Sequence, residues 1–386
     1  MYENINPNFY INNRDDIYRK VAPYSYKQID THVISGLFPG SINMYKNTPK
    51  ERAGYVFITR PQLNLLPSNL KRNRVYNTLV NSNPLSMERV IRATLDPRLQ
   101  TVFNLRCDLV DPYSPFINLL SNTIKSLSGF PDLVNETYSS QPGLRKETHV
   151  IVDGQLTYYQ EFDLDATFNN TVMEPIMRLF YIWGMYMADV FDGTCIPYVD
   201  FLARNEIDYN TRIWRIVTDE SDKYVSKILA TGASFPTTVP VGNWADYNSE
   251  SLFQEANSDI SIRFKSMGMT ALDTILINEF NRLMCMFHPV IRQTVEDGFE
   301  PTRAADKFYN IPKQYLNYFP IGKYPYISED NELCWIADLN DKKLTYAFDI
   351  IGNITGEHPK QYQNGFKKPN HNKNTRKILD DFSNLV

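Results

Sequence analysis

The sequence predicts a mixed α+β fold in which short strands, joined by tight turns, pack against one long apolar helix. Three observations support this class. Residues 146–268 contain runs in which apolar and polar residues alternate, which is the pattern of half-buried strands. Turn-forming residues separate these runs. A single stretch, residues 173–191, is apolar on nearly all sides and predicts a helix covered over most of its surface.

The chain of 386 residues divides into three predicted parts. Residues 1–145 form a region of mixed structure that is rich in Pro and Asn. Residues 146–268 form the strand-rich part, with a helix over residues 172–192. Residues 269–386 form a C-terminal part of helical and mixed structure that ends in a basic tail.

The first part contains one strand and two helices with recognisable ends. The strand is predicted over residues 55–59, and Pro61 ends it. One helix is predicted to begin at the cap Ser86, with Pro97 beyond its end. The other begins at Ser114, has a proline at its first position, and runs to Gly129.

The middle part begins with a hairpin signal, Asp153-Gly154, between two strand-like runs. A strand over residues 158–168 follows, with one apolar face and one polar face. The long helix has Thr171 and Glu174 in a capping-box arrangement, and Gly193 closes it. Three further strands are predicted over residues 211–217, 223–230 and 259–267.

The last part is less regular. A helix is predicted from a cap at Thr270 to the turn before Pro289. Residues 332–339 and 344–352 predict a pair of strands across Asn340-Asp341, and residues 377–385 predict a short helix.

Composition excludes several classes of protein. No run of about 18 apolar residues is present, so no membrane segment is predicted. The N-terminus lacks the basic and apolar regions of a secretory signal. The four cysteines lie far apart, which favours free thiols in a protein made in the cytoplasm over a disulfide framework or a cysteine metal site.

No motif in the sequence indicates catalysis. There is no phosphate loop, no G-x-G-x-x-G, no nucleophile elbow and no H-E-x-x-H, and the five histidines are scattered. We therefore predict no catalytic residue, no cofactor and no metal. Asp163 and Asp165 share a strand face with Glu161, so acid–base chemistry or a divalent ion is an alternative. A solvated strand face is the simpler interpretation.

Charge is distributed unevenly along the chain. Residues 50–106 contain ten basic and three acidic residues, a net charge of +7, whereas residues 150–260 contain six basic and seventeen acidic residues, a net charge of −11. The basic stretch supplies four candidate interface residues: Arg60, Lys71, Arg72 and Arg74. An arginine such as Arg60 can bind a carboxylate of a partner through two parallel hydrogen bonds, or it can bond locally to main chain. The whole chain carries a net charge of −4, which does not indicate a nucleic-acid-binding protein.

The order of elements in the middle part resembles that of the tail-tube family of contractile phage tails and related injection machines. The matching segments are 158–168, 172–193, 213–217, 224–230, 232–236 and 260–265. Residues 54–65, with Pro39-Gly40 upstream, are similar to a segment of structural proteins of large myophages. The resemblance implies an antiparallel β-barrel or sandwich of tail-tube type with a flanking helix, here with mixed N- and C-terminal extensions.

The resemblance also implies a structural protein of the virion tail without enzymatic activity. Such a protein forms a homo-oligomeric ring, hexameric in that family, with other tail, baseplate or neck proteins as partners. DNA would pass through the ring without sequence-specific binding, because basic contacts to phosphate slow its motion. Glu161, Asp163 and Asp165 are candidate acids facing the channel. The tube, the tube-initiating baseplate ring and the neck ring remain alternatives, as do a capsid- or portal-associated protein, an unrecognised enzyme and a soluble binding protein.

Overall fold

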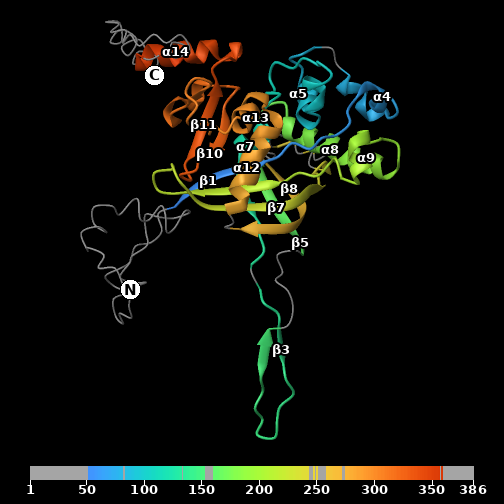
Figure 1. Ribbon diagram of the computed structural model, residues 1–386. Helices are drawn as coiled ribbons and strands as arrows, with labels where there is room; N and C mark the ends of the chain where they lie inside the picture. The colour runs from blue at the N-terminus through green and yellow to red at the C-terminus, as the bar shows by residue number, and fades with distance from the viewer. Residues whose placement is uncertain are drawn as a thin grey trace, which may run out of the picture.

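An antiparallel sheet of six strands lies at the centre of the molecule (Figure 1). The computed structural model describes residues 51–80, 83–132, 134–152, 160–242, 247, 249–250, 258–271, 274–356 and 358–359. The order across the sheet is β1-β6-β7-β8-β5-β2. The strands are β1 Arg52–Ile58, β2 Ile124–Ser128, β5 Glu161–Asn169, β6 Ile213–Thr218, β7 Val225–Thr238 and β8 Asp259–Ala271.

The two end strands of this sheet are connected by a short segment, residues 115–117. The Arg60 amide donates a hydrogen bond to the Pro115 carbonyl, and the Ile117 amide donates one to the Ile58 carbonyl, each 2.8 Å long. Helix α7, Asn118–Thr123, continues from this segment into β2 and contacts both β1 and β5. The sheet is therefore nearly closed and barrel-like, and the α+β class with an antiparallel barrel of tail-tube type is confirmed.

One face of the sheet packs on helix α8, Pro175–Phe191. Phe180 of this helix lies against Phe168 of β5 and Phe264 of β8, with ring centroids 5.8 and 5.7 Å apart. Helix α5, Met87–Leu95, packs on the outer side of α8. Only three of the seventeen residues of α8 are exposed, so the prediction of a helix covered on most sides is confirmed.

The other face is covered over β1, β6 and β7 only. Helix α12, Thr274–Phe287, lies here with a second sheet of order β10-β11-β9. Its strands are β9 Phe308–Asn310, β10 Tyr324–Ile327 and β11 Leu333–Asp338. Phe280 of α12 packs against Phe57 and Trp214 of the large sheet. On this face the side chains of β5 and β8 are left mostly exposed to solvent.

Shorter elements complete the described part of the chain. The helices are α4 Pro67–Leu70, α6 Arg98–Thr101, α9 Val199–Arg204, α13 Pro289–Glu296 and α14 Thr345–Thr355. The 3-10 helices are η2 Arg74–Leu79, η4 Lys313–Tyr318 and η5 Lys342–Leu344. A third sheet contains only β3 Thr137–Ser139 and β4 Val150–Val152.

Several predicted boundaries are confirmed. The Ser86 hydroxyl caps α5 by accepting a hydrogen bond from the Arg89 amide. Gly193, with φ +74°, follows the end of α8. The alternation in β5 is also as predicted, since Leu164, Ala166 and Phe168 are buried. The Asp153-Gly154 turn and the helix predicted over residues 377–385 lie outside the described residues.

Four local predictions are wrong. The helix predicted from Ser114 is short, and its second half is strand β2, in which Ile124 and Leu127 pack on the core beside β5. The capping box is absent, because Glu174 itself precedes α8 in a left-handed conformation, with φ +51°, and makes no side-chain cap. Thr270 lies within β8.

The fourth error is the C-terminal strand over residues 344–352, which is helix α14. Its buried residues Ala347, Phe348 and Ile351 follow helical spacing, so a short apolar run was assigned the wrong period. The division into three parts stays a prediction, although the large sheet takes β1 and β2 from the first of them.

Arg60 lies at the centre of the packing, directly after β1. Its side chain is 4% exposed. The guanidinium donates hydrogen bonds to the main-chain carbonyls of Ala93, Thr94, Asp111 and Ser114. Loss of hydration lowers the pKa of Arg60 to about 10, while the nearby Asp111 and Asp96 oppose this change. Arg60 is therefore a structural residue inside the subunit, and its donors are not directed at a partner.

Arg60→Met is expected to destabilise the fold by on the order of 3–5 kcal/mol, because it leaves several buried carbonyls without a donor. Urea denaturation measures this loss. Arg292→Met is the matched control: Arg292 is exposed and has no ion pair within the described part, so its change should stay within about 0.5 kcal/mol. Equal stability of the two variants would contradict the role given to Arg60.

Candidate functional site

A two-stranded ribbon projects from the sheet, and we call residues 134–152 the arm (Figure 1). Tyr138 of β3 lies opposite Ile151 of β4. Most of the arm is exposed, including its large apolar side chains. These are Val134, Tyr138, Leu144, Val150, Ile151 and Val152, with exposed fractions from 53% to 102%. Val150, Ile151 and Val152 are consecutive, so both faces of the ribbon carry exposed apolar residues.

A glycine lies at the point where the chain leaves the sheet toward the arm. Gly129 follows β2 with φ +107°, and a Cβ there would lie 2.2 Å from the Asp163 carbonyl oxygen of β5. Only glycine fits such a close approach of two main chains. The base of the arm is thereby held against β5.

The predicted acidic face is an ionic network of both signs. Glu161, Asp163 and Asp165 all project from the exposed face of β5. Lys265 of β8 lies 3.4 Å from a Glu161 oxygen and 3.3 Å from an Asp163 oxygen, and Arg263 Nε lies 2.9 Å from Asp165 Oδ1. Three carboxylates are therefore matched by two cations, and we call this surface the β5–β8 charged face.

The structure places Lys71, Arg72 and Arg74 together between α4 and η2, with all three side chains exposed. Arg72 has one long hydrogen bond, 3.5 Å, to the Thr194 carbonyl. Within the described residues none of the three forms an ion pair, so their charge faces solvent. The buried Arg60 does not belong to this surface.

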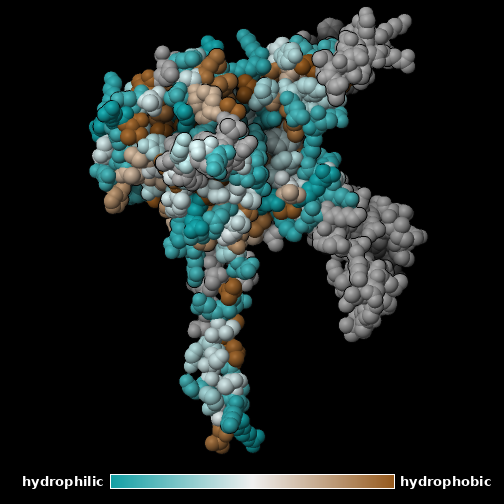
Figure 2. All heavy atoms as spheres, turned by 180° about the vertical axis from the view of Figure 1, so that it is seen from behind, coloured by the Kyte–Doolittle hydropathy of each residue, from teal (hydrophilic) through white to brown (hydrophobic). Residues whose placement is uncertain are grey.

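An apolar surface that the sequence did not predict surrounds α9, and we call it the α9 patch. None of the six residues of α9 is buried. Its large exposed side chains are Phe191, Ile196, Val199, Leu202 and Ile207, with exposed fractions from 42% to 91%. Figure 2 shows apolar side chains gathered at the left of the view, on the side that carries α8 and α9 in Figure 1. Exposed apolar side chains gathered on one side of a molecule are typical of an interaction site.

A buried carboxylate fixes the start of α9. Asp96 is fully buried and accepts hydrogen bonds from the Leu65 amide (2.9 Å) and the Tyr198 hydroxyl (2.8 Å). Burial raises the pKa of Asp96 to about 6. Beside it, Arg98 stacks over the Tyr198 ring and forms a pair with Asp200, with 2.7 Å between nitrogen and oxygen. The patch is therefore held rigidly at its inner edge.

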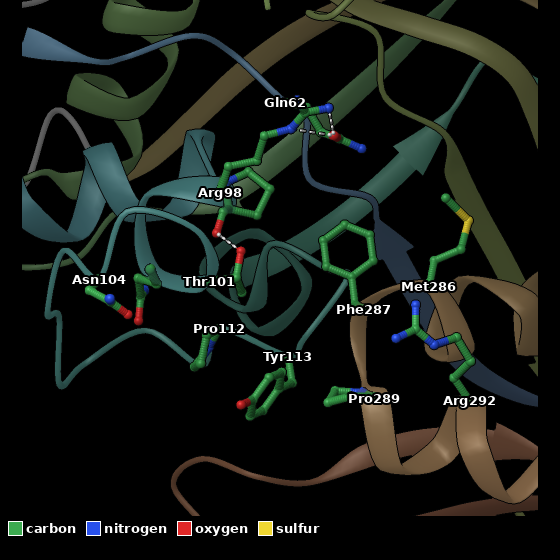
Figure 3. Close-up of a pocket in the computed structure, with 12 residues that line it drawn as sticks. Gln62, Arg98, Thr101, Asn104, Pro112, Tyr113, Met286, Phe287, Pro289 and Arg292 are labelled. Atoms are coloured by element: carbon green, nitrogen blue, oxygen red, sulfur yellow. Dashed lines mark hydrogen bonds between the residues drawn. The ribbon is translucent and has the colours of Figure 1, made fainter. Parts of the chain in front are cut away.

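A pocket of about 580 Å³ lies between the segment that follows α5 and helices α12 and α13 (Figure 3). Apolar and polar side chains such as Tyr113, Phe287 and Thr101 line it, with Arg98 and Arg292 at its sides. Its lining includes no carboxylate, histidine, cysteine or serine, so it offers no acid–base pair for catalysis.

Two features are absent from the described residues. Among them there is no group of three or more His, Cys, Asp or Glu side chains that could hold a metal ion. No helix there is both long and apolar enough to cross a membrane.

A nearly closed antiparallel sheet with one flanking apolar helix and exposed, chemically distinct surfaces is the architecture of a tail-tube-type structural protein. The family model described as "Putative phage tail tube protein" matches residues 34–349. The chain belongs to this family, and it is therefore a component of a phage tail.

Two solved structures are similar over part of the chain. One is the cap of the anti-feeding prophage, described as its tube-terminating cap, with 17% identity and a TM-score of 0.24 over 39% of this chain and 80% of that chain. The other is a sheath/tube terminator of an extracellular contractile injection system, with 11% identity and a TM-score of 0.22 over 39% and 85%. Both TM-scores are below 0.5, so these likenesses indicate no role. No curated protein matches the sequence.

Neither of the two apolar surfaces was predicted from the sequence. The sequence predicts the strand Val150–Val152, and its partner among the described residues is β3. Three consecutive β-branched residues next to polar residues were the available signal for an exposed ribbon. The α9 patch had no such signal, because its residues are separated in the sequence. Only their exposure in the folded structure distinguishes them from apolar residues of the core.

The stability of the protein is expected to fall as the pH rises from about 4 to about 6, through Asp96. Its folded-state pKa lies above that of an unfolded aspartate, near 3.9, so the folded state binds the proton more tightly in this window. The loss is on the order of 3 kcal/mol. Urea denaturation of the wild type and Asp96→Asn at several pH values measures it. The assignment to Asp96 would be contradicted if the free energy of unfolding changed with pH by the same amount in the wild type and in Asp96→Asn.

The variant Lys71→Glu/Arg72→Glu/Arg74→Glu reverses the charge of three exposed basic side chains. If copies of the chain associate through these side chains, the variant is expected to lose the salt-dependent part of that association. Light scattering at 50 and 500 mM NaCl measures assembly. Lys342→Glu/Lys343→Glu changes exposed lysines elsewhere and serves as the control. Unchanged assembly of the triple variant would rule out an interface at Lys71, Arg72 and Arg74.

Proposed function

We propose that copies of this chain assemble into a ring around the DNA conduit of a contractile phage tail. The observation that carries the proposal is the arm, a two-stranded ribbon with apolar residues exposed on both faces. A hairpin of two strands is marginally stable at best in water and needs packing from a third element. The described part of its own subunit supplies none over residues 137–139 and 150–152, so we propose that a neighbouring chain covers it.

The edges of the large sheet support assembly of several copies. Among the described residues, β2 is paired only with β5. Strand β1 is paired only with β6 up to Ile58, whose carbonyl accepts a hydrogen bond from the Ile117 amide. Unpaired strand edges bind further strands unless a protein blocks them. Joining the β1 edge of one copy to the β2 edge of the next would continue the sheet around a ring. We propose that this ring is a hexamer.

The β5–β8 charged face is suited to the wall of a channel. Its three carboxylates and two cations leave a small negative excess, and the cations are engaged by their carboxylate partners. Such a surface offers DNA phosphates few free cations, so it does not hold the strand in place. Glu161, Asp163 and Asp165 would then face the lumen, with no sequence-specific contact to DNA.

The place of the ring within the tail follows from which partners it binds. The main tube, the ring that initiates the tube at the baseplate and a ring at the neck all require a conduit of this kind. Other tail, baseplate or neck proteins are the expected partners, and no enzymatic step is part of the proposed role. Binding of the purified chain to each of these assemblies would distinguish the three positions.

Assembly is expected to depend on the apolar residues of the arm. The variant Tyr138→Ser/Ile151→Asp should remain folded and lose rings or larger oligomers, because it places polar groups where a neighbour must pack. Negative-stain electron microscopy with mass photometry over a concentration series measures this.

Tyr346→Asp is the control, since Tyr346 is 75% exposed and lies on α14 away from the arm. A wild-type protein that is monomeric at every concentration would contradict self-assembly. If the arm variant still formed rings with a central hole, the arm would not be part of the interface.

A further inference from the structure

The arm and the α9 patch are two apolar surfaces on different sides of one subunit, and each is left exposed by the residues that the structure describes. Leu144, near the tip of the arm, is fully exposed. Val199 and Leu202 of α9 are 79% and 50% exposed. Figure 1 shows the arm projecting away from the side that carries α9, and Figure 2 shows apolar side chains both along the arm and at that side. The arm of a subunit therefore points away from its own patch.

Each of the two surfaces is only partly supported by the described part of its own subunit. The arm contains three residues in each strand, too few for a stable hairpin on its own. Helix α9 has six residues with no buried side chain, which is far shorter than a helix that is stable alone in water. Covering either surface with apolar groups would stabilise it.

The charges at the two surfaces are complementary. Arg145 and Lys146 lie at the tip of the arm, exposed, and have no ion-pair partner in the described part of the chain. One exposed carboxylate, Glu147, follows them and accepts a hydrogen bond from the Arg145 amide, so the two cations outnumber it. Residues 191–207 around the patch contain three carboxylates and one arginine. Of these, Asp192 is exposed and unpaired among the described residues, Glu206 is exposed and lies 4.0 Å from Arg204, and Asp200 is held by Arg98. A cationic tip with an apolar leucine thus matches an apolar surface with an acidic rim.

We propose that the tip of the arm docks on the α9 patch of a second copy of this chain. Leu144 packs against Val199 and Leu202, and Arg145 and Lys146 face Asp192 and Glu206. The inference rests on the proposed self-assembly and names one further contact between copies, in addition to the joined sheet edges. Because the arm and the patch are different surfaces, the contact is head-to-tail, so it extends from copy to copy unless the geometry closes it into a ring.

A photo-crosslinking experiment on the full chain tests this contact. Leu144 is replaced by p-benzoylphenylalanine, and the protein is assembled from a mixture of ¹⁴N- and ¹⁵N-labelled copies before irradiation. Mixed-isotope crosslinks from position 144 to residues 191–207 are the expected result. Crosslinks confined to other segments, in assemblies that form normally, would overturn the docking site and leave self-assembly in place.

A charge exchange provides the second test. Arg145→Glu/Lys146→Glu is expected to weaken association at least tenfold in mass photometry, and Asp192→Lys/Glu206→Lys in the same chain to restore it. Val199→Asp/Leu202→Asp should also weaken association, with Leu85→Asp, 58% exposed elsewhere, as the control. Circular dichroism and urea denaturation show whether each variant is folded. Folded patch variants that associate like the wild type would overturn the proposal, and a wild type that never associates would overturn both it and the proposed function.

Discussion

Much of this structure depends on the burial of one charged side chain, Arg60, at the end of β1. Its guanidinium binds main-chain carbonyls at the end of α5 and in the segment around Asp111 and Ser114. A buried cation is tolerated only where hydrogen-bond acceptors surround it, so these segments cannot shift independently. Residues 115–117, which connect the two ends of the sheet, directly follow the last of these acceptors. The closure of the sheet and the position of Arg60 are thus parts of one arrangement.

Buried pairs of aspartate and tyrosine hold the irregular segments in a similar way. The Tyr76 hydroxyl lies 2.5 Å from Asp189, and the Tyr186 hydroxyl lies 2.6 Å from Asp208. Asp96 and Tyr198 form a third pair, which anchors the start of α9. Each hydrogen bond gives a buried carboxylate one donor and joins residues at least 22 positions apart in the sequence. These loops are therefore fixed by side chains where no sheet or helix fixes them, and the α9 patch remains exposed on a rigid base.

The rigid interior contrasts with the surfaces that face outward. The arm and the α9 patch expose apolar groups, whereas the β5–β8 charged face exposes carboxylates already matched by cations. The first kind of surface gains free energy when another chain covers it, and the second gains little from further contact. In the ring proposed above, the first kind of surface would contact neighbouring copies and the second would line the channel.

The sequence by itself determined the elements whose signals are local. The alternation of β5, the cap at Ser86 and the apolar character of α8 depend on neighbouring residues, and the order of elements was sufficient to indicate the tail-tube type. Tertiary structure decided where short apolar runs became strand or helix, as in β2 and α14, because burial and not propensity sets the period there. It also decided that Arg60 is buried and that the acids of β5 are paired across β8. These outcomes depend on contacts between residues far apart in the chain, whose partners only the folded arrangement brings together.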